Sequence, residues 1–124
     1  MNLTLWILQS ALAALFAVAG LLKLSRPLPV LNDVVGGWVH DVPLQLIRTI
    51  GGLEVAGALA LVLPAALGIA PWLTWLAAVG LIATMVGGGA VHARRGETRE
   101  VAFNVVLALL LAAVVWGRLG PHAF

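Results

Sequence analysis

The sequence predicts an all-α fold, a transmembrane bundle of four helices that run up and down across a bilayer. Of the 124 residues, 62% are hydrophobic and only 10% are charged, and the mean hydropathy is +1.08. A water-exposed surface of mixed charge does not give such values. Four spans of roughly 20 residues would use most of the chain. We therefore expect a single transmembrane domain, 1–124, in the cell (inner or plasma) membrane.

The first span, about 3–24, carries no charged side chain before Lys23, and Pro27 follows soon after it. The alternative is a cleaved signal peptide, but no Lys or Arg precedes the apolar run, as it does in such peptides. Residues 25–41 then form the one long polar connection. Its prolines, glycines and tryptophan predict a segment at the membrane surface.

The second span, about 43–63, begins at Pro43, because proline is favoured in the first turn of a helix. Pro64 is expected to end it, since proline lacks a backbone donor and clashes with the preceding turn. The third span, about 71–91, again opens with a proline, Pro71. The short stretch between these two spans predicts a tight helical hairpin.

The fourth span, about 101–117, follows the only charge-dense segment and is closed by Arg118. Cytoplasmic connections of membrane proteins are enriched in lysine and arginine. We therefore expect the first and third connections to be cytoplasmic and both termini to face outward. Six of the seven basic residues lie on the side of these connections: Lys23, Arg26, Arg48, Arg94, Arg95 and Arg99.

The composition also excludes several kinds of function. Without cysteine, the chain has no thiol for redox chemistry or for binding a metal. A net charge of +2 is too small to indicate a basic surface that binds nucleic acid. The three histidines are scattered, and no nucleophile constellation or phosphate loop is present. We expect no metal, no nucleic-acid partner and a chain that is not an enzyme by itself.

Each span carries a stripe of small or polar side chains, which is typical of helix contact faces in lipid. Near the predicted cytoplasmic side, these stripes hold polar residues that we expect to meet in one cluster inside the bundle: Lys23, Arg48, Glu54, His92 and Asn104. Small residues beside the cluster are expected to line a pocket: Gly20, Gly51, Thr84 and Gly88.

Glu54 is the most informative of these residues. A carboxylate within a span costs several kcal/mol unless it is paired, hydrated or protonated. Arg48 lies six residues earlier, about 240° around the helix, so Lys23 and His92 are the better placed partners. Glu54 is then either half of a structural pair that locks the bundle or a group that binds a ligand or a proton.

These residues resemble the DoxX-like family of small four-helix membrane proteins. The stretches that carry the resemblance are 20–23, 48–54 with Gly57, 61–64, 92–97, Asn104 and 116–118. Some relatives are subunits of a thiosulfate:quinone oxidoreductase, others are associated with quinone or catechol stress, and remote ones are assembly factors. The resemblance implies that the five residues of the predicted cluster are recurring polar positions, without implying a chemical role for them.

The leading hypothesis is an accessory or ligand-binding subunit that holds a quinone-like small molecule against the Glu54 cluster. Glycines beside a polar group would leave space for a ring and offer hydrogen bonds to its oxygens. One alternative is an assembly factor or structural subunit of a larger membrane complex, with another membrane protein or a second copy in a homo-oligomer as its partner. The other alternative is a small proton-coupled transporter.

Overall fold

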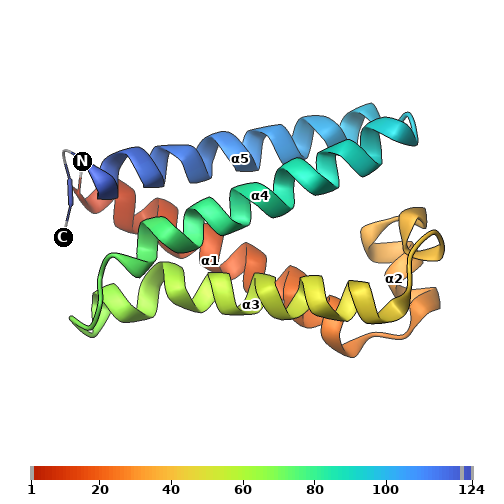
Figure 1. Ribbon diagram of the computed structural model, residues 1–124, viewed down its shortest axis with the longest axis horizontal. Helices are drawn as coiled ribbons and strands as arrows, with labels where there is room; N and C mark the ends of the chain where they lie inside the picture. The colour runs from red at the N-terminus through yellow and green to blue at the C-terminus, as the bar shows by residue number, and fades with distance from the viewer. Residues whose placement is uncertain (1, 121, 124) are drawn as a thin grey trace.

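Four long apolar helices dominate the computed structural model, which describes residues 2–120 and 122–123. They run alternately in opposite directions (Figure 1). Each is long and apolar enough to cross a membrane, and the described residues contain no strand. The all-α prediction is confirmed. The helices are α1 (Asn2–Ser25), α3 (Leu44–Ala66), α4 (Leu73–Arg94) and α5 (Thr98–Leu119).

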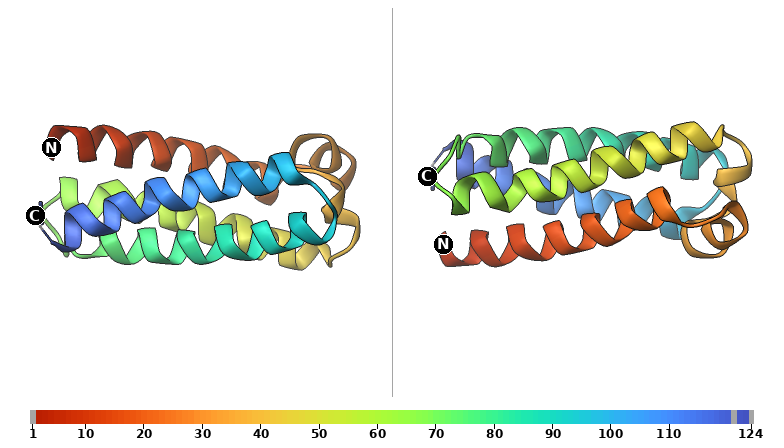
Figure 2. Two further views of the ribbon diagram at one scale, coloured as in Figure 1. Left: turned by 90° about the horizontal axis from the view of Figure 1, so that it is seen from above. Right: turned by 90° about the horizontal axis from the view of Figure 1, so that it is seen from below.

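The long helices pack mainly as two pairs of successive helices. α1 lies along α3, and α4 lies along α5, while α3 and α4 join the two pairs. Both chain ends and the α3–α4 turn lie at one end of the molecule, called here the terminal end (Figures 1 and 2). The other end holds the α1–α3 connection and the α4–α5 turn, and is called here the connection end.

The main core is an apolar cluster to which all four long helices contribute. Phe16 of α1, Leu61 of α3, Ala78 of α4 and Leu111 of α5 are among its fully buried members. Many large apolar side chains point outward instead, such as Leu109 on α5. An apolar exterior around an apolar core is expected of helices that are solvated by acyl chains.

The polar connection contains two short helices, α2 (Leu28–Val35) and the 3-10 helix η1 (Gly37–His40). Gly36 separates them with a φ of 117°, a conformation that favours glycine. Leu31 of α2 and Val39 of η1 are buried against Ile47 in the first turn of α3. The connection is therefore packed onto the bundle rather than extended along a surface.

Several helix boundaries differ from those predicted. α4 begins at Leu73, two residues after Pro71, and ends at Arg94, three residues later than predicted. α3 continues past Pro64 to Ala66, because a proline in the last turn removes only one backbone hydrogen bond of the helix. α5 begins at Thr98, three residues before the predicted start of the fourth span. Its charged first turn is helical although it is polar, since a helix can extend beyond the hydrocarbon layer.

Candidate functional site

The inner face of α3 places Glu54 opposite the last turn of α1. Nζ of Lys23 lies 2.7 Å from Oε1 of Glu54, and the two residues are 9% and 2% exposed. Of the two partners predicted for this carboxylate, the structure thus pairs it with Lys23. Opposite charges at this distance offset much of the cost of burying each charge alone.

Two glycines allow α1 and α3 to come close enough for this ion pair. A Cβ atom on Gly20 would lie 2.6 Å from the carbonyl oxygen of Gly51, and one on Gly51 would lie 2.7 Å from that of Gly20. Both distances are too short for any side chain. The structure corrects the expectation that these glycines line a pocket, because the two backbones occupy that space themselves.

Arg48 lies beside the ion pair but contacts backbone rather than a carboxylate. Its Nη1 donates to the carbonyl oxygens of Lys23, at 2.6 Å, and of Arg26, at 2.8 Å. The last carbonyls of a helix have no partner within the helix. Arg48 satisfies one of them, that of Lys23, together with the Arg26 carbonyl just after the helix, and so fixes the end of α1 against α3.

His92 takes part in a different set of charged contacts, at the α4–α5 turn. Its Nδ1 lies 2.8 Å from Oε1 of Glu97, which also lies 3.3 Å from Nε of Arg95. Arg95 in turn forms an ion pair with Asp41, the residue after η1. The hydrogen bond from His92, followed by the nearby charge of Arg95, holds the pKa of Glu97 below its usual value of about 4.5.

Asn104 joins α5 to α4 one helical turn into the span. Its Nδ2 donates to the carbonyl oxygen of Met85 at 3.2 Å. A Cβ on Gly88 would lie 2.7 Å from the same nitrogen, so this glycine makes room for the amide. The predicted cluster is therefore divided between an α1–α3 group, with Lys23 and Glu54, and an α4–α5 group.

A second buried polar network, absent from the predicted site, lies at the terminal end. Arg118 is 3% exposed, and its Nε donates to Oε1 of Gln9 at 2.6 Å. Its Nη1 donates to the side chain of Asn2 and to the carbonyl of His122, and its guanidinium lies 5.4 Å from the ring centroid of Trp6. The sequence signal for this network was Gln9, an amide inside a charge-free span.

The same network reaches the other two long helices through one carbonyl group. Nε2 of Gln9 donates to the Leu61 carbonyl oxygen at 2.8 Å, and Oγ1 of Thr74 donates to it at 3.2 Å. The Leu61 carbonyl of α3 is thus an acceptor shared by a side chain of α1 and a side chain of α4.

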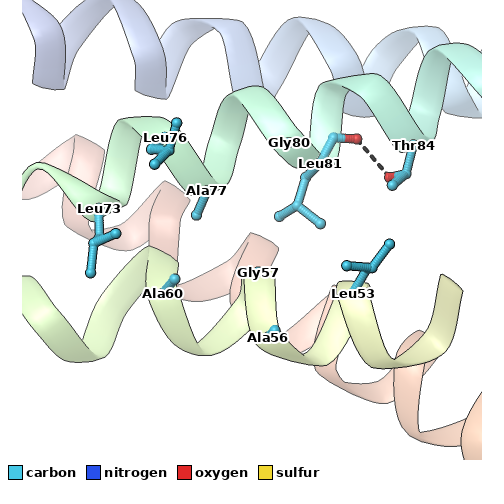
Figure 3. A pocket seen from close by; sticks show the side chains of 10 residues that line it. All are labelled: Leu53, Ala56, Gly57, Ala60, Leu73, Leu76, Ala77, Gly80, Leu81 and Thr84. Atoms are coloured by element: carbon cyan, nitrogen blue, oxygen red, sulfur yellow. Dashed lines mark hydrogen bonds between the residues drawn. The ribbon is translucent and has the colours of Figure 1, made fainter. Parts of the chain in front are cut away.

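An apolar groove of about 380 Å³ runs between α3 and α4. Figure 3 shows the Leu53 and Leu81 side chains in the gap between the two helices. Leu81 packs against Gly57, whereas the space beside Gly80 is open. Thr84 is the only predicted pocket residue that lines it. The remaining lining residues are apolar: Ala56, Ala60, Leu73, Leu76 and Ala77.

Within the described part of the chain, no three histidine, aspartate or glutamate side chains gather where they could hold a metal ion. The arrangement thus offers two buried polar groups and an apolar groove between α3 and α4.

Comparison with protein families matched residues 7–114 to the sequence model of the DoxX-like family. Neither the curated proteins nor the solved structures gave a match. The matched range includes the larger part of each long helix and contains Lys23, Glu54 and Gln9, but it ends before Arg118.

Proposed function

The chain belongs to the DoxX-like family and is a multi-pass integral membrane protein, and from this premise we propose that it is an accessory subunit that binds a quinone-like amphiphile in the α3–α4 groove. The observation that carries the proposal is the groove itself. Its volume of about 380 Å³ lies within the range of roughly 300–1,000 Å³ that is usual for small-molecule sites. Its lining is apolar except for Thr84, as suits a ring with a hydrocarbon tail.

The groove fits this role better than the space beside Glu54 does. The contact between Gly20 and Gly51 closes that space, and Glu54 is paired with Lys23. The groove, in contrast, opens toward the lipid, from which an amphiphile could enter sideways. The proposed ligand site is thus kept but moved from the α1-facing side of α3 to its α4-facing side.

The one polar group in the groove favours the reduced form of such a ligand. Oγ1 of Thr84 donates its proton to the Leu81 carbonyl at 2.7 Å, which leaves the hydroxyl oxygen as an acceptor only. A quinol hydroxyl can donate to that oxygen, whereas a quinone carbonyl cannot. We expect the groove to hold the quinol more tightly than the quinone.

The test is purification in native lipid followed by extraction and mass spectrometry. Gly80→Leu would fill the groove, because nothing lies within 4 Å of a Cβ at that position. Gly87→Leu is the matched control on the same helix, since its Cβ also meets nothing and it does not line the groove. We expect a stoichiometric quinone or quinol with the wild type and Gly87→Leu, and its loss with Gly80→Leu. Equal recovery from all three, or none from the wild type, would contradict the proposal.

A second candidate function is that of a structural subunit or assembly factor. The groove is lined by small residues from two helices, Ala56, Gly57 and Ala60 of α3 with Ala77 and Gly80 of α4, and such surfaces admit another membrane helix. Crosslinking in the native membrane separates the two candidates. A second protein or a second copy crosslinked near Gly80, without an extractable small molecule, would favour the subunit role.

The orientation in the membrane is part of the proposal. The connection end carries six of the seven basic residues and the terminal end only Arg118, which supports a cytoplasmic connection end. The chain has no cysteine, so single cysteines report sidedness directly. In intact cells, Leu67→Cys at the terminal end should react with an impermeant maleimide and Asp33→Cys at the connection end should not. The reverse pattern would invert the topology.

A further inference from the structure

The α1–α3 connection is tied down at three separate points. Arg48 holds the carbonyl of Arg26, just before α2. Leu31 and Val39 are buried against Ile47. At the far end of the connection, Asp41 pairs with Arg95 of the α4–α5 turn. A connection that only linked α1 to α3 would need none of these contacts.

The buried face of α3 shows what this connection covers. Ile47, Gly51 and Glu54 are buried in succession at spacings of four and three, which places them on one face of the helix. Ile47 lies under the connection, and Glu54 lies two turns deeper, next to Lys23. The connection therefore lies between the connection end of the molecule and the buried ion pair.

We propose that residues 28–41 form a strap that closes the aqueous path to the Lys23–Glu54 pair, with Arg95 as its fastener. This inference goes beyond the proposed function and does not depend on the α3–α4 groove. Arg95 suits the role because it bridges two parts of the chain, Asp41 on the strap and Glu97 on the α4–α5 turn.

Two features make the fastener weaker than the structure beneath it. The Arg95 and Asp41 side chains are 33% and 61% exposed, and such pairs are screened by salt. The guanidinium of Arg95 also needs Gly37 beside it, because a Cβ on that residue would lie 2.7 Å from Nη2 of Arg95. The buried ion pair below, in contrast, is held by close helix packing.

The experiment measures how fast a water-soluble maleimide reacts with the cysteine of Ile47→Cys in nanodiscs, where both faces are accessible. We expect Arg95→Gln and Asp41→Asn each to raise this rate roughly two- to fivefold, the range for loss of a part-exposed ion pair. Raised salt should do the same in the parent protein. Arg94→Gln is the matched control, because Arg94 is the exposed neighbour and forms no ion pair within the described residues.

A second cysteine distinguishes an open strap from an unfolded bundle. Ala58→Cys lies on the same buried face of α3, deeper in the core, and should stay unreactive in every variant. The proposal is overturned if Arg95→Gln and Asp41→Asn react no faster than Arg94→Gln. It is equally overturned if the cysteines of Ile47→Cys and Ala58→Cys gain reactivity together. The Arg95–Asp41 ion pair would then stabilise the whole bundle and not the strap alone.

Discussion

Lys23 and Glu54 form an ion pair between α1 and α3, with 2.7 Å between Nζ and Oε1 and with both residues buried. Removing one charge leaves the other buried without a partner, which typically costs about 3–5 kcal/mol. We therefore expect Lys23→Met and Glu54→Gln each to lower the thermal unfolding temperature in detergent strongly.

The double variant Lys23→Met with Glu54→Leu shows whether the single variants are unstable because a charge is left unpaired or because packing is lost. Replacing both charges by apolar groups of similar volume is often neutral for stability. We expect the double variant to unfold near the wild-type temperature. If it is as unstable as the single variants, the cost lies in packing and not in an unpaired charge.

The contact of Gly20 with Gly51 predicts opposite effects at two adjacent glycines. Gly51→Ala would place a Cβ against the α1 backbone, and overpacking of this kind costs about 1–3 kcal/mol. Gly52→Ala meets nothing within 4 Å and gains helix stability of about 0.5–1 kcal/mol. Unfolding temperatures should therefore fall for Gly51→Ala and rise for Gly52→Ala, and a fall in both would mean that the close contact is not specific.

The network around Arg118 predicts that Gln9 stabilises the terminal end. In Gln9→Leu the Arg118 Nε and the Leu61 carbonyl each lose a hydrogen-bond partner, at a cost of about 1–3 kcal/mol. Gln45→Leu is the control, because that glutamine is on the exposed side of the first turn of α3. Hydrogen exchange should increase near Arg118 in Gln9→Leu only, and equal exchange in the two variants would count against the network.

The lowered pKa of Glu97 predicts a loss of stability in acid. A carboxyl whose folded pKa is depressed contributes stability above its unfolded value of about 4.5, and loses it as the pH falls through the folded value. Glu97→Gln should therefore destabilise the protein at pH 7 and make little difference at pH 3. In a His92→Gln background, which removes the main cause of the shift, the pH dependence of this difference should shrink.

Much of the fold could be predicted because the bilayer leaves the backbone few options. Long charge-free runs must be helical, so the four spans followed from composition alone. The two short helices of the connection could not be found in this way. The prolines at 27 and 29 gave no helical signal, yet proline is compatible with the first turn of a helix, and α2 begins at Leu28 between them.

The candidate site could be predicted only in part, because the sequence indicates the depth of a residue along its helix but not which neighbouring helix it contacts. Depth along a helix follows from residue number, and so Lys23 was placed beside Glu54. The choice between helices at the same depth depends on packing details of a few ångströms. His92 pairs within its own turn, where Gly96 with a φ of 72° brings Glu97 back to the helix end. Arg118 was predicted only to close the fourth span, and its bond to Gln9 depends on the same packing details.

The pairing of successive helices bears on how the protein is made. α1 and α3 share their most extensive contacts with each other, as do α4 and α5, and each pair is contiguous along the chain apart from the strap. During synthesis the first hairpin can complete its ion pair and glycine contact before the second has left the ribosome. The Gln9–Arg118 hydrogen bond joins residues 109 positions apart, so it can form only after translation of the last helix and would mark the end of assembly.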